Sequence, residues 1–241
     1  MRFDIVTIFP DIFDSYFNTS IIKRAQQKKI VRIFIHNLRQ WSRGKHQTVD
    51  DRPYGGGPGM ILKIEPLYRA ISSLIRRTSI DKRKQIKIIL LTPDGKQFNQ
   101  KMAGELSKLK GVVLVCGRYE GFDERIKKFV DKKISVGPYV LTGGEIPAMI
   151  IVDAVTRLMP GVINSESLEQ ESGTEIKNWL SARAKKMKIV SEYPQYTRPE
   201  VFTYKNKSGI VKTLKVPRIL LSGKHSEIQK WRKRKCSLTI E

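Results

Sequence analysis

Three glycine-rich strings each follow an apolar run that predicts a buried strand. They are Thr92-Pro93-Asp94-Gly95, the string 117–121 (GRYEG) and the string 137–144 (GPYVLTGG). The carboxyl ends of parallel strands meet at one edge of an open α/β sheet, and ligands bind there. Glycines let backbone N–H and C=O groups approach a ligand closely. One such loop is more often an ordinary turn, but three at one edge predict a small-molecule site.

The predicted site does not have the sequence of the common phosphate-binding loops. No string reads G-x-x-x-x-G-K-[ST], and none supplies G-x-G-x-x-G between a strand and a helix. Residues 52–60 (RPYGGGPGM) are rich in glycine but lack the lysine and the preceding strand of a P-loop. They lie in a long connection, residues 37–63, and such a loop is usually functional or disordered. Asp50, Asp51 and Arg52 give this connection its polar side chains.

The elements that must position these loops alternate between short β-branched runs and longer amphipathic stretches. This pattern is typical of a parallel sheet covered by helices. Strands are predicted at residues 3–9, 30–36, 86–92, 112–116 and 134–136. Helices are predicted around residues 11–28, 65–77, 99–109, 123–130 and 144–158. The fold class is therefore α/β, and the 241 residues suffice for one large domain, or for one of roughly 150 residues and a smaller one.

The charge of the chain indicates a polyanionic partner. Forty-six Lys and Arg residues against 23 Asp and Glu give a formal net charge of +23, and nucleic acid is the first partner that such a field suggests. Seventeen of the basic residues but only four of the acidic residues come after Glu175, so the positive charge is concentrated in this part of the chain. Residues 176–191 form a basic insert, interpreted as a linker or a mobile arm. The basic C-terminal module predicts binding to an RNA backbone, and a solvated helix face without a partner is the alternative.

Other classes of site and location are disfavoured. No run of about 18 apolar residues predicts a membrane span, and residues 1–10 lack the basic segment and the cleavage site of a secretory signal. We therefore expect a cytoplasmic protein that does not contact a membrane. Cys116 and Cys236 lie in unlike contexts and do not suggest a disulfide framework, and three His residues offer no zinc-binding spacing.

Four strings, in their order and spacing, resemble the bacterial tRNA (guanine-N1-)-methyltransferases. They are residues 49–60 (VDDRPYGGGPGM), 116–125 (CGRYEGFDER), 139–145 (YVLTGGE) and 196–200 (YTRPE). The resemblance runs from the start of the chain to about Trp231, and motifs of this length are specific. The sequence departs from the family in the basic insert before Tyr193 and in Gln195, where the family often has His.

The resemblance implies a fold, a cofactor and an assembly. The fold is a parallel α/β sheet with a deep trefoil knot of the SPOUT class, plus a small, mainly helical C-terminal domain. The knotted domain would span residues 1–163, an interdomain linker 164–192, and a shortened tRNA-binding domain 193–241. The family is an obligate homodimer whose active site takes residues from both chains. S-adenosylmethionine would sit bent in the knot, against the residues that match the family's motifs: Thr92, Pro93, Gly117, Tyr119, Glu120, Val136, Gly137, Pro138, Tyr139, Val140, Leu141, Gly143 and Gly144.

The chemistry of methyl transfer to guanine N1 requires a base for the N1 proton and a cation or donor for the charge that grows on O6. The resemblance implies that Arg157 is the cation. The base falls on Glu171 in the string 168–172 (LEQES), where the family usually has Asp, and Glu169 is the alternative if the register is shifted. Asp50 is a further catalytic candidate. The family uses magnesium, so a metal near Glu120 and Glu171 is expected.

The sequence therefore predicts an enzyme that transfers a methyl group from S-adenosylmethionine to N1 of the guanosine immediately 3′ of the anticodon in tRNA. Two alternatives stay open. One is a non-catalytic, knotted RNA-binding protein that has lost the base. The other is a knotted 2′-O-ribose methyltransferase, which would place the methyl group on a ribose.

Overall fold

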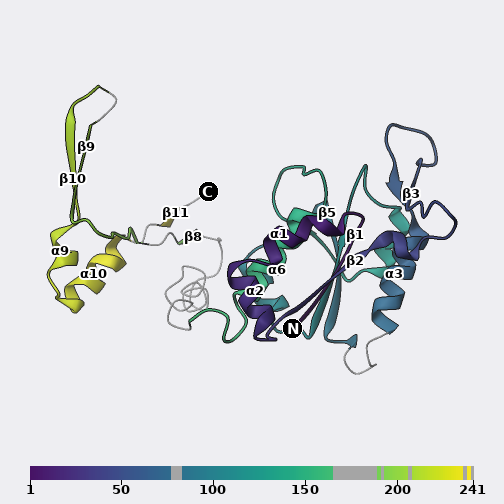
Figure 1. Ribbon diagram of the computed structural model, residues 1–241, viewed down its shortest axis with the longest axis horizontal. Coiled ribbons are helices and arrows are strands. Elements are labelled where there is room, and N and C mark those ends of the chain that lie inside the picture. The colour runs from purple at the N-terminus through teal and green to yellow at the C-terminus, as the bar shows by residue number, and fades with distance from the viewer. Residues whose placement is uncertain (77–82, 165–188, 191–192, 206–207, 236–237, 240–241) are drawn as a thin grey trace. The chain divides into compact units, whose positions relative to one another are not determined.

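The computed structural model describes residues 1–76, 83–164, 189–190, 193–205, 208–235 and 238–239 (Figure 1). The chain divides into two compact units, Met1–Ser165 and Glu166–Glu241. None of the described helices is both long enough and apolar enough to cross a membrane.

A five-stranded parallel sheet forms the centre of the first unit. Its order is β2-β1-β6-β5-β7, and all five strands were predicted from the sequence. Their bounds are β1 (Arg2–Thr7), β2 (Arg32–Asn37), β5 (Ile86–Gln97), β6 (Gly111–Cys116) and β7 (Lys132–Ser135). All six residues of β6 are buried, as expected for a central strand covered on both faces. The α/β class with a parallel sheet is confirmed, and the trefoil knot stays a prediction.

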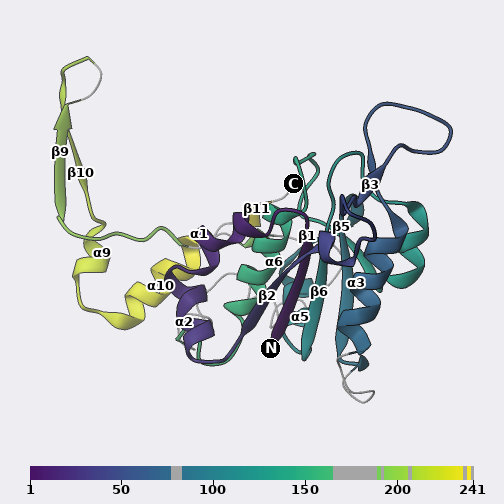
Figure 2. The ribbon, with the colours of Figure 1, turned by 45° about the vertical axis from the view of Figure 1, so that its right-hand side comes forward.

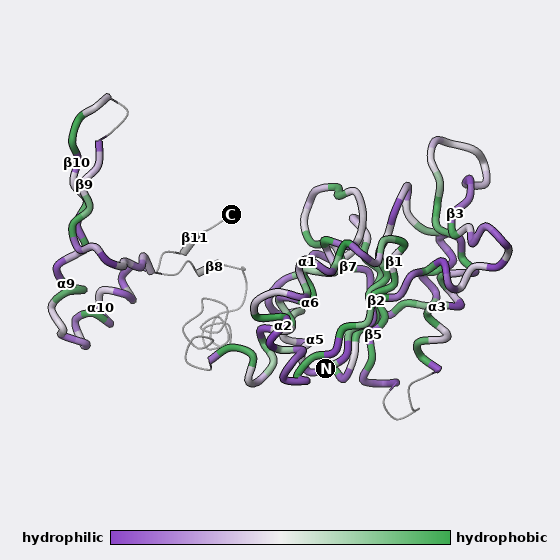
Figure 3. The backbone as a smooth tube through the Cα atoms, viewed as in Figure 1, coloured by the Kyte–Doolittle hydropathy of each residue, from purple (hydrophilic) through white to green (hydrophobic). Residues whose placement is uncertain are grey.

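Alternate residues of the central strands enter two separate hydrophobic cores. Leu114 of β6 packs with helices α1 (Asp14–Phe17), α2 (Ser20–Gln27), α5 (Gln100–Leu106) and α6 (Glu145–Thr156). Val113 and Val115 pack on the other face with α3 (Ile64–Arg76) and the 3-10 helices η2 (Leu38–Trp41) and η3 (Glu124–Phe129). This period of two follows from the pleat of a strand, and hydrophobic residues accordingly concentrate along the sheet in Figure 3.

Two predicted helices differ from the structure. The stretch 11–28 is divided into η1 (Pro10–Phe13), α1 and α2. Thr19 is extended and Ser20 has a positive φ of 46°, because short polar side chains such as those of Asn18, Thr19 and Ser20 favour turns and caps over helix interiors. The stretch 123–130 is the 3-10 helix η3, which begins where the Asp123 side chain accepts a hydrogen bond from Arg125 N.

Strand β5 runs past the point where its end was predicted. The sequence places a loop after Thr92, but β5 continues to Gln97 and pairs with β7 on both sides of a register shift between Leu91 and Lys96. The string 92–95 is therefore a bulge inside a strand. A Cβ at Gly95 would lie 2.5 Å from the backbone N of Ile134, so a glycine is required for this close approach.

The second unit contains a β-hairpin that the sequence did not predict. Its strands are β9 (Val201–Lys205) and β10 (Val211–Lys215), followed by α9 (Arg218–Leu221) and α10 (His225–Lys235). Figures 1 and 2 show the hairpin extending away from these two helices. Two short strands, β8 (Ile189–Val190) and β11 (Leu238–Thr239), pair with each other.

Candidate active site

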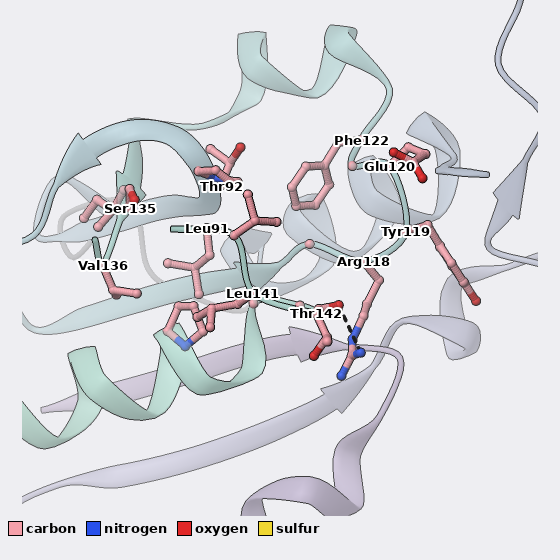
Figure 4. A pocket seen from close by; sticks show the side chains of 18 of the residues that line it. Leu91, Thr92, Arg118, Tyr119, Glu120, Phe122, Ser135, Val136, Leu141 and Thr142 are labelled. Carbon is pink, nitrogen blue, oxygen red and sulfur yellow. Dashed lines mark hydrogen bonds between the residues drawn. The ribbon is translucent and has the colours of Figure 1, made fainter. Parts of the chain in front are cut away.

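A cavity of about 240 Å³ lies where the bulge of β5 meets the loops after β6 and β7. In Figure 4, Leu91, Val136 and Leu141 lie toward one end of this cavity, and Tyr119 and Glu120 lie toward the other. The lining residues come from three segments and from the first turn of α6. They are Leu91, Thr92, Pro93, Gly117, Arg118, Tyr119, Glu120, Gly121, Phe122, Ile134, Ser135, Val136, Tyr139, Val140, Leu141, Thr142, Gly143, Gly144 and Pro147.

Most of the residues predicted to bind the cofactor line this cavity. Two of the predicted residues, Gly137 and Pro138, do not. Gly137 lies behind the lining, since the Tyr139 ring covers it so closely that a Cβ would overlap the ring. Sequence reasoning missed Arg118 and Thr142, among others, although both lie inside the predicted glycine-rich strings. Their position next to predicted residues was the signal that they too face the site.

Glycines bring the start of α6 against the end of β6. Gly144 N donates a 2.9 Å hydrogen bond to Gly117 O. A Cβ at Gly144 would lie 2.7 Å from Cys116 Cα and from Gly117 N, both backbone atoms that cannot move aside. A Cβ at Gly117 would lie 2.9 Å from the Phe122 ring. The cavity wall therefore depends on the absence of side chains at Gly117 and Gly144.

A buried ion pair joins two of the cavity loops. The Glu145 side chain is 1% exposed and accepts hydrogen bonds from Thr7 Oγ1 at 2.7 Å and from Arg118 Nε at 3.0 Å. Arg118 Nη1 donates to Thr142 O at 3.1 Å, and the Arg118 guanidinium lies 4.6 Å from the centre of the Phe9 ring. These contacts fix the 117–121 loop relative to the 137–144 loop.

The bulge of β5 carries a strongly acidic carboxyl group. Asp94 accepts hydrogen bonds from Lys133 Nζ and from Thr92 Oγ1. Hydrogen bonding, first from Lys133 and then from Thr92, lowers the pKa of Asp94 to about 2. Since Thr92 lines the cavity and Lys133 belongs to β7, Asp94 links a cavity residue to β7.

The glycine-rich connection 52–60 is attached to the 117–121 loop of the site. It is closed by the short antiparallel pair β3 (Asp50–Asp51) and β4 (Ile61–Leu62). Leu62 N donates to Gly121 O at 2.9 Å, and Glu120 N donates to Met60 O at 3.0 Å. Asp50 is therefore held near the 117–121 loop without lining the cavity.

Among the predicted catalytic residues that the structure describes, Arg157 and Asp50 do not line the cavity. Arg157 follows the last residue of α6, whereas the cavity lies at the first turn of that helix. Twelve helical residues span about 18 Å, so Arg157 is far from the cavity of its own chain. Glu169, Glu171 and the basic insert up to residue 188 lie outside the described residues. Within the described part, no three His, Cys, Asp or Glu side chains are grouped so that they could hold a metal ion.

Comparisons with known proteins agree on one family. The family model of tRNA (Guanine-1)-methyltransferase TrmD matches residues 1–240. The tRNA (guanine-N(1)-)-methyltransferase of Dictyoglomus turgidum is 49% identical over 235 residues, which are 97% of this chain and 84% of that protein. The enzyme of the same name from Chloroflexus aggregans is 48% identical over 97% of this chain and 82% of its own length. The crystal structure of tRNA (m1G37) methyltransferase from Aquifex aeolicus superposes with a TM-score of 0.70 at 37% identity, covering 96% of this chain and 87% of that one.

Proposed function

The chain belongs to the tRNA (guanine-N1-)-methyltransferase family, and from that premise we propose that it methylates N1 of the guanosine immediately 3′ of the anticodon in tRNA. The methyl donor is S-adenosylmethionine. The observation that carries the proposal is the cavity at the carboxyl edge of the parallel sheet, built from the same glycine-rich strings that carry the family resemblance. We also propose that the enzyme works in the cytoplasm, where its substrate is found.

The cavity has the chemical character that this cofactor needs. The side chains of Leu91, Val136 and Leu141 supply an apolar surface for an adenine ring. Gly117 and Gly143 leave backbone groups accessible for hydrogen bonds to polar atoms of the cofactor. Bound there, S-adenosylmethionine supplies an electrophilic methyl group on its sulfonium. Of the two predicted residues outside the lining, Gly137 lies against the Tyr139 ring and so affects the cavity through that lining residue.

The catalytic roles follow from the proton on guanine N1. We assign Glu171 as the base that removes this proton, with Glu169 as the alternative. Arg157 would stabilise the negative charge that grows on O6, since a guanidinium offers fixed N–H donors and is always charged. Asp50 is assigned a supporting role beside the 117–121 loop, because β3 is held there through β4.

The position of Arg157 supports an active site shared between two chains. It lies at the far end of α6 from the cavity of its own chain, so it would reach a cavity only in a partner. An apolar surface suitable for such a partner exists on η1, α1 and α6. Ile12, Tyr16, Ile146 and Ile150 are all more than a third exposed, and the Tyr16 hydroxyl donates a hydrogen bond to Asp153 between α1 and α6.

Intersubunit complementation tests the shared site. Arg157→Ala and Gly144→Val chains should each be inactive alone, one lacking the cation and the other a usable cavity. Mixed and refolded together, they should regain methylation, because one cavity in each mixed dimer combines an intact Gly144 with an intact Arg157. Absence of any regained activity, with mixed dimers present, would place both residues in the same chain's site.

Magnesium is proposed as a partner of Glu120 and Glu171. The Glu120 side chain is exposed at the cavity and lies against Gly59 of the glycine-rich connection. Carboxylates are the side chains that Mg²⁺ prefers. Glu120→Gln should therefore raise the magnesium concentration needed for half-maximal methylation, while S-adenosylmethionine affinity measured without metal changes little.

The base assignment is tested by single-turnover kinetics. Glu171→Gln should preserve the affinities for cofactor and tRNA while slowing the chemical step by about 10²- to 10⁴-fold, as expected for loss of a general base. Glu171→Asp keeps the charge and tests whether the longer side chain is needed. Full activity of Glu171→Gln together with loss of activity in Glu169→Gln would move the base to Glu169.

The product itself separates the proposal from its alternatives. The protein is incubated with tRNA from cells that lack the endogenous enzyme and with S-adenosylmethionine labelled in its methyl group. Digestion to nucleosides should recover the label in N1-methylguanosine. Label on a ribose would indicate a 2′-O-methyltransferase. Binding of tRNA without any label would indicate a non-catalytic RNA-binding protein.

Residues after 192 are proposed as the tRNA-binding domain, reached through a linker over 164–192 from a knotted domain over 1–163. The basic side chains of α10 support this role, since Lys230, Arg234 and Lys235 lie on it and all three are exposed. Truncation after Ser222 should weaken tRNA binding far more than cofactor binding. Equal loss of both would assign the segment a structural role.

A further inference from the structure

The hairpin of β9 and β10 exposes every one of its strand side chains. All ten residues of the two strands are exposed, although half of them are apolar or aromatic. Figure 3 shows hydrophobic residues along the hairpin, and Figures 1 and 2 show no other described element of the second unit packed along its length. An isolated two-stranded hairpin buries little and is marginally stable by itself. Its exposed apolar residues therefore indicate a binding surface.

The strand register divides the hairpin into two unlike faces. Phe202 lies opposite Leu214, and Tyr204 lies opposite Lys212. Directly opposed residues share a face, so these four residues form one face, here called the aromatic face. The rings of Phe202 and Tyr204 are stacked, with centroids 5.9 Å apart and an interplanar angle of 11°. They are 54% and 37% exposed.

The other face carries β-branched residues and two more lysines. Val201, Thr203 and Lys205 of β9 lie opposite residues of β10, and the hydroxyls of Thr203 and Thr213 lie 3.4 Å apart. This face has no aromatic side chain. It offers sites for matched control substitutions.

The charges of the hairpin are of one sign. Its described strands carry Lys205, Lys212 and Lys215 and no acidic residue. Lysines on an exposed apolar surface disfavour burial against another protein core, because each ammonium would have to be desolvated or paired. A polyanion with flat apolar groups satisfies both features at once. Single-stranded nucleic acid has this combination, since its phosphates meet lysines and its bases stack on aromatic rings.

We propose that the aromatic face of the hairpin binds unpaired nucleotides of the tRNA substrate. A base stacks on the exposed side of the Phe202 and Tyr204 pair, and Lys212, which lies on the same face, contacts a phosphate of that strand. Lys205 and Lys215 lie on the other face and add to the positive potential of the hairpin. Paired regions do not offer the face of a base, because it is covered by its neighbours in the helix. The inference rests on the proposed function for the identity of the RNA, and it adds which part of the chain contacts unpaired bases.

The experiment compares two RNAs with two pairs of substitutions in the full chain. The RNAs are a tRNA with guanosine 3′ of its anticodon and a fully paired RNA duplex with the same number of phosphates. Phe202→Thr with Tyr204→Thr removes the rings and keeps β-branched residues that favour strands. Val201→Thr with Val211→Thr is the matched control on the other face. Fluorescence anisotropy measures each affinity, and circular dichroism checks that each variant is folded.

Loss of the rings should weaken tRNA binding by about 10- to 100-fold, from the size of base–aromatic stacking. Duplex binding should change by less than about threefold, and the control pair should change both affinities by less than about twofold. Unchanged tRNA affinity, or an equal loss for the duplex, would overturn the proposal. Unchanged tRNA affinity with a lower sedimenting mass would assign the hairpin to an interface between copies of the chain, which also overturns it.

Lys212 gives a second measurement that does not depend on the aromatic variants. Lys212→Gln should reduce the slope of log affinity against log salt by about 0.7, the contribution of one neutralised phosphate of a single strand. An unchanged slope would contradict the phosphate contact. Failure of the wild-type chain to methylate tRNA would instead refute the proposed function, so the two failures are distinct.

Discussion

The ion pair between Glu145 and Arg118 should stabilise the cavity, and Glu145→Gln tests this. The substitution keeps the shape of the side chain but removes the negative charge, leaving Arg118 without its carboxylate. Breaking a buried ion pair typically costs about 3 to 5 kcal/mol. The Arg118 side chain is 19% exposed and keeps its hydrogen bond to Thr142 O, so we expect a smaller loss of about 2 kcal/mol. For a unit of this size, that corresponds to a fall in melting temperature of about 4 to 8 °C.

The assay is a double-mutant cycle read by calorimetry. Glu145→Gln, Arg118→Met and the double variant are melted, and their S-adenosylmethionine affinities are measured by titration. If the pair interacts, the double variant loses less than the sum of the single losses. Since Arg118 also holds the Thr142 carbonyl, cofactor binding should weaken by about tenfold, equivalent to about 1.4 kcal/mol.

An exposed ion pair supplies the control. Glu105→Gln removes the partner of Lys132, and both of these side chains are at least 40% exposed, so stability should fall by less than about 1 kcal/mol. Strictly additive losses in the cycle, or a loss at Glu145 no larger than that at Glu105, would refute the reasoning.

Two further predictions concern the cavity loops. Gly144→Val should abolish measurable binding of S-adenosylmethionine by titration calorimetry, because its Cβ would meet the backbone at the end of β6. Gly104→Ala is the control and should leave the affinity unchanged, since there is open space around Gly104. Retained affinity in a folded Gly144→Val chain would contradict the prediction. Asp94 has its pKa lowered to about 2, mainly by Lys133, so its stabilising contribution is complete above the unfolded value of about 3.9 and is lost as pH falls toward 2. Asp94→Asn should therefore flatten the melting temperature between about pH 4 and pH 2, and an unchanged acid limb would argue against it.

The sequence predicted the parts of the fold that depend on local patterns. The five strands were found because short continuous runs rich in β-branched residues, such as 112–116, are typical of buried strands. The continuation of β5 past Thr92 was missed, since Pro93 and Gly95 locally favour a turn and the pairing that overrides them comes from β7. The hairpin was missed because it is exposed on both faces, so residues 201–205 and 211–215 lack the strict alternation of apolar and polar residues that marks a half-buried strand.

The candidate site shows the same division. Glycine-rich strings identified most of the cavity lining, because a close approach of two backbone segments requires glycine, and glycine is visible in the sequence. No local pattern indicates the pairing of Glu145 with Thr7 and Arg118, since these partners lie 138 and 27 residues away in the sequence. Only the folded sheet brings these side chains together.

The order of strands in the sheet also has a consequence for how the protein is made. Strand β1 is synthesised first but lies between β2 and β6, with Arg2 paired to Gly111. Its second neighbour therefore does not exist until about a hundred further residues have been translated. At about 5 to 20 residues per second, β1 waits roughly 5 to 20 seconds with one side of its backbone unpaired. Ribosome speed between β2 and β6 thus sets how long a nascent apolar edge stays available to chaperones or to aggregation.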